Sequence, residues 1–233
     1  MDSTAKKKLV IAIDGPAGAG KSTIAAHLAR KLGYVNLESG AMYRALALKA
    51  LETNIAISSE PALVELAHAT RIELIPTAEG NRVLLDGRDV SSRVRETNVT
   101  QAASVVSTHP GVREWMVLRQ RELGSRGGVI MEGRDIGTVV FPHADVKIFL
   151  DAEQGIRAGR RIAQANATDP EKAAKLIHDL QERDRRDTTR TISPLVAAPD
   201  AVHVDSSTLS IEDVIATIER VIAHRLSKAN VSR

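Results

Sequence analysis

The stretch that decides the fold is LVIAIDGPAGAGKSTIAAHLARKLG, residues 9–33. Its first five residues, 9–13, are all apolar, and such a short continuous run predicts a strand buried on both faces. The last thirteen residues carry one isoleucine and two leucines at four-residue spacing and end at Gly33, which predicts a helix with its stop signal. A glycine-rich turn joins the two, so the stretch is expected to form a strand, a tight loop and a helix.

The turn Gly15-Pro16-Ala17-Gly18-Ala19-Gly20-Lys21-Ser22 matches the P-loop pattern G-x-x-x-x-G-K-[ST]. Glycines let backbone N–H groups turn inward around phosphate oxygens, and the helix that follows directs its positive end at the same anion. Lys21 is expected to place a charge on the outer phosphates, and the Ser22 hydroxyl is the expected metal ligand, for Mg²⁺. The motif predicts a nucleoside triphosphate, although GTPases, motors and kinases all share it. The residues expected to hold the nucleotide are Gly15, Ala17, Gly18, Ala19, Gly20, Lys21, Ser22 and Thr23.

The rest of the chain alternates apolar runs with helical patterns, which predicts a parallel sheet covered by helices on both faces. Further strands are expected at 129–132, 146–150 and 201–204, and helices at 41–53, 170–187 and 211–226. The segment 71–87 breaks this rhythm and predicts an antiparallel hairpin with its turn at 77–81. The polar tail 227–233 is expected to fray.

Composition excludes several classes of protein. The 233 residues contain no cysteine, so disulfides, thiolate metal sites and cysteine nucleophiles are absent. Aromatic residues make up 2%, and the net charge of +3 comes from 32 basic and 29 acidic residues, which disfavours nucleic-acid binding. The apolar run 9–13 is too short for a signal peptide or a membrane span. We expect a soluble, cytoplasmic monomer with no membrane partner.

Arginines gather where an anion could be held. Ser39 and Gly40 precede the second expected helix, Arg44 lies one turn into it, and residues 132–135 (EGRD) follow an expected strand. Seven arginines lie between residues 157 and 190, and guanidinium groups suit phosphate recognition. Each of these, taken alone, also fits a charged solvent-facing helix. Their combination with a P-loop favours a phosphoryl-transfer site.

Several long motifs together resemble the bacterial cytidylate kinases over nearly the whole chain. The matching segments are LVIAIDGPAGAGKST, LESGAMYRALAL, EGRDIGTVVFPHADVKIFLDA and RDRRDTTRTISPLVAAPDAVHVDSS. The resemblance implies one α/β domain over 1–233 with the P-loop nucleoside monophosphate kinase fold. It implies a five-stranded parallel sheet flanked by helices, a small antiparallel CMP-binding insertion at about 65–100 and a helical lid at about 155–187.

The resemblance also implies roles for individual side chains. Arg44 and Arg134 match residues that hold the CMP phosphate, with Ser39 close by. The family residues that read the cytosine edge correspond to Ser104, Arg113 and Asp135. The family residues at the ribose correspond to Arg183 and Asp187. In the lid region Arg157 is expected to help hold ATP. The expected catalytic cations are Lys21, Arg134, Arg190 and Arg161. Glu38 and Glu132 stand where the family often has Asp, so no role is assigned to them.

The expected reaction is ATP + CMP or dCMP → ADP + CDP or dCDP, by direct in-line transfer assisted by Mg²⁺. Two alternatives stay open: a P-loop kinase for another small acceptor such as UMP, and a regulatory nucleotide-binding switch. A GTPase would need a guanine-reading motif such as N-K-x-D, and the sequence has none.

Overall fold

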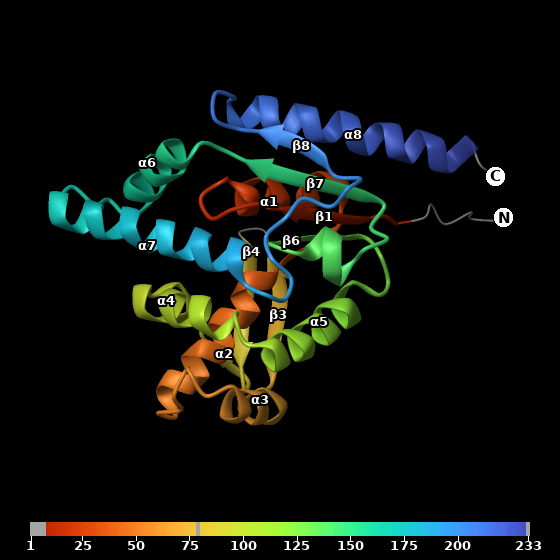
Figure 1. Ribbon diagram of the computed structural model, residues 1–233. Coiled ribbons are helices and arrows are strands. Elements are labelled where there is room, and N and C mark those ends of the chain that lie inside the picture. Colours follow the sequence, from red (N-terminus) through yellow and green to blue (C-terminus); the bar gives the residue numbers. More distant parts are fainter. Residues whose placement is uncertain (1–7, 78–79, 232–233) are drawn as a thin grey trace.

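The computed structural model describes residues 8–77 and 80–231. Its centre is a five-stranded sheet in the order β2-β6-β1-β7-β8, with every neighbouring pair parallel (Figure 1). The strands are β1 (Val10–Asp14), β2 (Val35–Glu38), β6 (Val129–Gly133), β7 (Val146–Asp151) and β8 (Val202–Asp205). Four of them confirm the strands expected from apolar runs. The edge strand β2 was missed because its four residues, VNLE, alternate apolar and polar side chains over too short a length to stand out.

Two apolar layers cover the sheet, as the alternating pattern predicted. Ile11 and Ile13 of β1 pack with α1 (Lys21–Leu32) and α8 (Ile211–Val231) on one face. Ala12 faces the other side, toward a larger cluster built from α2 (Ser39–Glu52), α3 (Glu60–Ala69), α4 (Thr97–Val106) and α5 (Pro110–Gly124). Successive residues of a strand point to opposite faces, so a strand buried on both sides must be apolar throughout.

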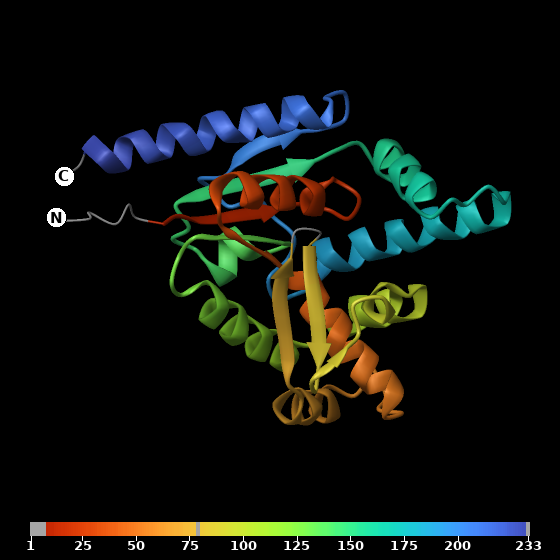
Figure 2. The ribbon, with the colours of Figure 1, turned by 180° about the vertical axis from the view of Figure 1, so that it is seen from behind.

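A second, antiparallel sheet interrupts the α/β order. It consists of β3 (Ile72–Thr77), β4 (Gly80–Leu85) and β5 (Arg88–Asp89), and the pairing of Ile72 with Leu85 confirms the expected hairpin. Part of the turn expected at 77–81 lies outside the described residues, at positions 78–79. Figure 2 shows β3 and β4 running from α3 up to the parallel sheet. The helices α3, α4 and α5 around this sheet were not predicted.

Two helices, α6 (Gln154–Gln164) and α7 (Pro170–Thr189), follow β7 and occupy the region expected to form the lid. The expectation of a frayed tail is wrong for the described part, because α8 continues to Val231. The segment SKANV contains no glycine or proline, so nothing in it stops the helix. Residues 232–233 lie outside the description. The shorter elements are a 3₁₀ turn, Arg93–Arg95, and a π-helical turn, Ile136–Val140. Among the described helices none is long and apolar enough to cross a membrane.

Candidate active site

The glycine-rich loop joins β1 to α1 at the carboxyl end of the central strand, which confirms the context that the motif required. Gly15, Gly18 and Gly20 all have positive φ, at 147°, 79° and 96°. A Cβ on Gly15 would lie 1.9 Å from the backbone oxygen of Leu150, so only glycine fits there. The helix α1 begins with no side-chain cap and no acidic residue in its first turn. Its first N–H groups are therefore suited to an anion.

Lys21 is the first residue of α1, and its Nζ donates a hydrogen bond to the carbonyl oxygen of Pro16 at 2.6 Å. Its side chain is buried, and burial lowers the pKa of Lys21 to about 7, with a further contribution from the positive charges of Arg134 and Arg183. A lysine buried among other cations loses its proton easily unless an anion is near. This part of the site is therefore electrostatically matched to phosphate.

The P-loop is linked directly to the end of β6. The Ser22 hydroxyl donates to Oε1 of Glu132 at 2.5 Å, although the two residues are 110 positions apart. Burial raises the pKa of the Glu132 carboxyl, and the negative charge of Glu38 raises it further. Asp14, at the end of β1, accepts hydrogen bonds from the backbone N–H groups of Ile136 and Gly137 at 2.8 and 2.7 Å. These bonds fasten the segment after β6 beside the P-loop.

A cluster of arginines surrounds one carboxylate, Asp187, near the C-terminal end of α7. Arg134 Nε donates to Oδ2 of Asp187 at 2.8 Å, and Arg183 Nε and Arg190 Nη1 lie 3.9 and 3.7 Å from its oxygens. Burial opposes ionisation of this carboxyl, but the three arginines hold the pKa of Asp187 below its usual value. The spacing predicted a shared helical face for residues 183, 187 and 190 if the helix ran that far. Arg183 and Asp187 both lie on α7, but the helix ends at Thr189 and Arg190 is its extended C-terminal cap.

The same cluster carries more positive than negative charge. Burial, followed by the repulsion from Arg134, lowers the pKa of Arg183 to about 10. Arg190 donates from Nε to the carbonyl oxygen of Ser193 at 2.6 Å, while its buried Nη2 has no partner among the described residues. An excess of buried guanidinium groups with unused donors is the arrangement that phosphate oxygens satisfy.

Ser39 and Arg44 lie at the start of α2, directly after the edge strand β2. Helix α2 starts at Ser39, two residues earlier than expected, and the Ser39 hydroxyl donates to the carbonyl oxygen of Glu132 at 2.7 Å. Arg44 Nη2 forms an ion pair with Oε1 of Glu38 at 2.5 Å. Burial opposes ionisation of the Glu38 carboxyl, but the positive charges of Arg44, Arg95 and Arg183 hold the pKa of Glu38 below its usual value.

Arg113 and Asp135, the residues expected to read the base, form an ion pair in the interior. Their side chains are only 3% and 8% exposed. Arg113 also donates from Nη1 to the carbonyl oxygen of Ser107 at 3.1 Å, and its guanidinium carbon lies 5.7 Å from the centre of the Tyr43 ring. Ser104, one turn before Ser107 on α4, accepts a hydrogen bond from Nε of Arg186 on α7 at 3.1 Å. Arg186 was not singled out by the sequence.

The three arginines of α6 have different surroundings. Arg157 is buried and donates to the carbonyl oxygens of Ala152 and Ala17 at 2.9 and 3.0 Å and to Oδ2 of Asp184 at 2.5 Å. Arg160 donates to the hydroxyl and carbonyl oxygens of Ser206, on the strand side of the helix. Arg161 is half-buried and contacts Gln164 of its own helix at 3.0 Å. Arg157 thus joins α6, α7 and the P-loop.

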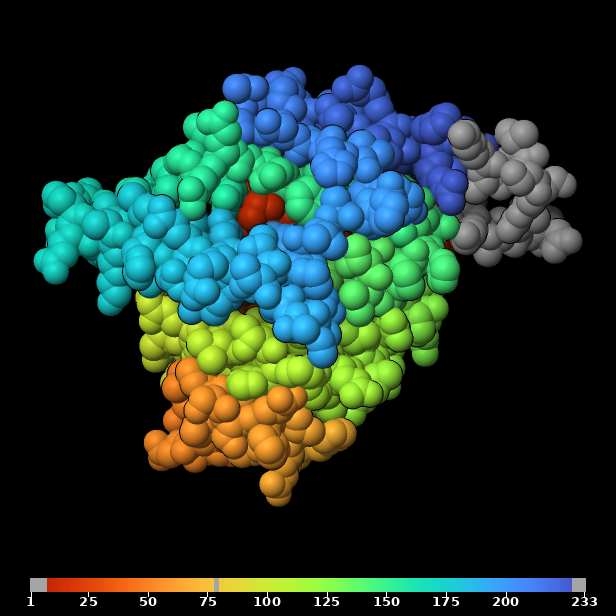
Figure 3. All heavy atoms as spheres, in the orientation of Figure 1, coloured from red at the N-terminus to blue at the C-terminus, as the bar shows by residue number. Residues whose placement is uncertain are grey.

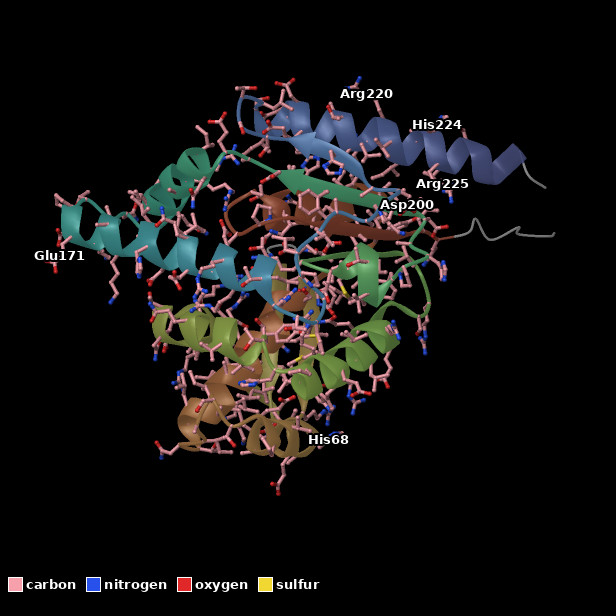
Figure 4. The ribbon with its side chains drawn as sticks, viewed as in Figure 1. His68, Glu171, Asp200, Arg220, His224 and Arg225 are labelled. Carbon is pink, nitrogen blue, oxygen red and sulfur yellow. The ribbon has the colours of Figure 1, made fainter. Side chains whose placement is uncertain are left out.

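The site opens to the surface between the two lid-region helices and the sheet. In Figure 3, red atoms of the N-terminal part of the chain are visible at the bottom of a hollow framed by α6, α7 and the blue segment that leads to β8. Figure 4 shows Glu171 at the outer end of α7, far from the sheet, whereas Arg183 and Asp187 lie in the other half of this helix. Helix α7 therefore reaches from the surface to the P-loop.

Sequence reasoning missed two carboxylates of the site, Asp14 and Asp184, and named Glu38 and Glu132 without assigning them a role. Asp14 carried a usable signal, because it directly precedes the first glycine of the P-loop. Burial raises the pKa of Asp14 to about 6. Asp184 carried no usable signal in the sequence, because the segment RDRRD at residues 183–187 fits a solvent-facing helix equally well. The structure shows Asp184 paired with Arg157 across two helices.

Comparisons with known proteins cover almost the whole chain. The family model described as cytidylate kinase matches residues 11–224. A cytidylate kinase from Solibacter usitatus (strain Ellin6076) is 46% identical over 230 residues, covering 97% of both chains. Another, from Geobacillus kaustophilus (strain HTA426), is 48% identical over 222 residues, covering 95% of this chain and 99% of that one. A solved structure of an uncharacterized protein from Eubacterium ventriosum ATCC 27560 covers 93% of this chain and 99% of its own, with a TM-score of 0.50 and 10% identity. That likeness concerns the fold alone.

Proposed function

Because this chain belongs to the cytidylate kinase family, we propose that it transfers the terminal phosphoryl group of ATP to CMP and dCMP. The observation that carries the proposal is the concentration of positive charge beside the P-loop. Lys21 is buried, Arg134 and Arg183 are half-buried, and the three cations lie close enough together to lower the pKa of Lys21 and Arg183. Bound phosphate groups would stabilise all three cations, and charge neutralisation of this kind is the main requirement of phosphoryl transfer.

ATP is proposed to bind at the P-loop. The backbone of residues 15–20 and the start of α1 would surround its phosphates, and Lys21 would move from the Pro16 carbonyl to the outer phosphates. Ser22 and Thr23 continue the first turn of α1. Arg157 would contribute by holding the loop against α6 and α7 through Ala17 and Asp184.

CMP is proposed to bind between α2, α4 and α7. Its phosphate would lie among Arg44, Arg134 and the start of α2 at Ser39, and its ribose beside Arg183 and Asp187. The base would lie next to Ser104, Arg113 and Asp135. Each of these side chains is held by a protein contact in the structure, so binding would exchange some of those contacts for contacts to the nucleotide.

Mg²⁺ is proposed to be held by Ser22 and Glu132. A hydroxyl and a carboxylate oxygen are the hard ligands that Mg²⁺ prefers, and it usually takes one or two carboxylates together with substrate phosphates. Residues 8–77 and 80–231 contain no group of three or more His, Cys, Asp or Glu side chains that could hold a metal ion. When bound, the ion would neutralise charge on the phosphates.

Transfer is proposed to be direct, with no covalent enzyme intermediate. The acceptor phosphate is already a nucleophile, so the protein has to align it and neutralise charge on the migrating group. Lys21, Arg134 and Arg190 would do this from the fixed part of the site, and Arg161 from the lid formed by α6 and α7. Closure of the lid would keep water away from ATP. The enzyme is proposed to act as a monomer in the cytoplasm, where nucleotides are available.

A coupled assay of ADP release tests the proposal. Purified protein is supplied with ATP and Mg²⁺, and with CMP, dCMP, UMP or no acceptor. We expect rapid turnover with CMP and dCMP, much slower turnover with UMP and almost none without an acceptor. Equal turnover in the absence of any acceptor would indicate an ATPase or a nucleotide switch, and a preference for UMP would indicate the other open alternative.

A further inference from the structure

Within residues 8–77 and 80–231 no strand is hydrogen-bonded to the outer side of the edge strand β2, since the order of the parallel sheet begins β2-β6. One side chain of the antiparallel sheet takes that place. Asn81, at the start of β4, donates from Nδ2 to the carbonyl oxygen of Asn36 at 2.7 Å. Its Oδ1 accepts the backbone N–H of Glu38 at 2.8 Å. Asn81 is 8% exposed, and its bond to Asn36 is buried while its bond to Glu38 is partly buried.

These two backbone groups are the ones that a parallel strand would use. In a parallel ladder, the residue opposite Leu37 would donate to the carbonyl of residue 36 and accept from the N–H of residue 38. The carboxamide of Asn81 supplies one donor and one acceptor in this arrangement and reproduces the pairing of a single residue. A side chain of the inserted sheet thus extends the parallel sheet by one residue.

Polar groups and open space border this corner of the molecule. A cavity of about 300 Å³ lies beside it, between α1, β2 and the end of β3, and is lined by residues that include Ala29, Tyr34 and Pro76. The buried Oδ1 of Asn36 has no hydrogen-bond partner among the described residues. The two hydrogen bonds of Asn81 are therefore the polar part of the attachment between the inserted sheet and β2, beside the apolar packing of Leu37 with Val83.

The attachment ends at the proposed acceptor site. Glu38 receives Asn81 on its backbone N–H, and its side chain forms the 2.5 Å ion pair with Arg44. The next residue, Ser39, begins α2 and bonds to the end of β6. A shift of the Glu38 peptide would displace both the carboxylate that orients Arg44 and the start of α2.

We propose that Asn81 is a positioning residue for the acceptor: by completing the edge of β2 it fixes Glu38, and through Glu38 it orients Arg44 toward the CMP phosphate. The inference rests on the proposed function. Asn81 itself touches no reacting group. Its loss is expected to weaken the use of CMP while ATP binding, which depends on β1 and α1, stays unchanged.

The test is steady-state kinetics of Asn81→Ala with each substrate varied in turn. Two buried backbone groups lose their partners, and we expect KM for CMP to rise about tenfold, in line with the loss of a buried hydrogen bond. KM for ATP should change less than twofold. Arg82→Ala is the matched control, because Arg82 is the next residue of β4, its side chain is 52% exposed, and it is predicted to leave both KM values unchanged.

A double-mutant cycle with Arg44→Ala separates positioning from a general loss of structure. If Asn81 acts through Glu38 and Arg44, Asn81→Ala should raise KM for CMP much less in the Arg44→Ala background than in wild type. Full additivity, or equal changes in KM for CMP and ATP, would overturn the inference. Should Asn81→Ala not fold, Asn81→Asp keeps the volume and the acceptor for Glu38 while losing the donor, and the same split is expected. Wild-type turnover with CMP is measured first, so failure of the proposed function is distinguished from failure of the positioning role.

Discussion

Asp135→Asn is the most informative single change, because Asp135 is both a buried partner of Arg113 and the proposed reader of the cytosine amino group. The substitution keeps the volume of the side chain and removes its charge. Arg113 would keep its bond to the Ser107 carbonyl and its contact with the Tyr43 ring, but its charge would be buried without a counter-ion. Both side chains are nearly inaccessible, at 3% and 8% exposure.

The expected loss of stability follows from the burial of this ion pair. Removal of one member of a buried ion pair costs about 3–5 kcal/mol, because the remaining charge is left uncompensated. Asparagine retains one oxygen acceptor for Arg113, so we expect a loss of roughly 3 kcal/mol in the free energy of unfolding, at the lower end of that range. The control Asp213→Asn makes the same chemical change on the exposed side of α8, where Asp213 accepts from Ser210 at 2.7 Å, and should cost less than about 1 kcal/mol.

The second expected effect of Asp135→Asn is a change in selectivity between CMP and UMP. Cytosine presents an amino donor where uracil presents a carbonyl acceptor. A carboxylate therefore suits cytosine and repels uracil, whereas a carboxamide can serve either base. We expect kcat/KM for CMP to fall by roughly ten- to a hundredfold, as for a lost charged hydrogen bond. The kcat/KM for UMP should fall less or rise, so the ratio of kcat/KM for CMP to kcat/KM for UMP becomes smaller.

The assay measures kcat/KM for CMP and UMP with wild type, Asp135→Asn and Asp213→Asn, alongside urea unfolding of each protein. A narrower ratio together with an unchanged KM for ATP supports base reading. If the two acceptors lose activity in equal proportion, Asp135 only neutralises Arg113, and the reasoning from cytosine is refuted.

Three further predictions concern the P-loop and the arginine cluster. Lys21→Ala should reduce turnover by several orders of magnitude, as for a lost transition-state cation. Thermal stability should not fall, because burial of the wild-type ammonium group is itself unfavourable. Near-normal turnover would contradict the P-loop assignment. Since burial lowers the pKa of Lys21 to about 7 in the free protein, most Lys21 side chains are neutral at pH 8, and ATP binding should restore the charge by taking up close to one proton. Calorimetry in two buffers of different ionisation enthalpy measures this uptake, and its persistence in Lys21→Met would assign it to another group. Asp187→Ala should weaken CMP binding by about 1.5–3 kcal/mol, seen as a higher KM for CMP, with little change in KM for ATP. Equal changes in both KM values would show that Asp187 acts in the lid or in the stability of the fold and not at the ribose.

The order of the main elements was predictable because its signals are local. A run of apolar residues before Asp14 and the spacing of leucines after Gly20 depend only on neighbouring positions, and both predictions are confirmed. The edge strand β2 was not predicted, because an edge strand needs fewer apolar residues than a central strand and so carries a weaker local signal. The helices α3, α4 and α5 were not predicted; α4, with the sequence TNVTQAASVV, is rich in β-branched residues, which have low helix propensity.

Sequence alone determined the P-loop, the parallel α/β fold and the family, because each depends on patterns written in consecutive residues. The tertiary structure decided which charges meet. Ser22 bonds to Glu132, Arg113 to Asp135, and Asp187 to Arg134. Asn81 completes the edge of β2 from a different sheet. Such pairs lie tens of residues apart in the chain, and their distances are set by how strands and helices pack, which no local pattern encodes.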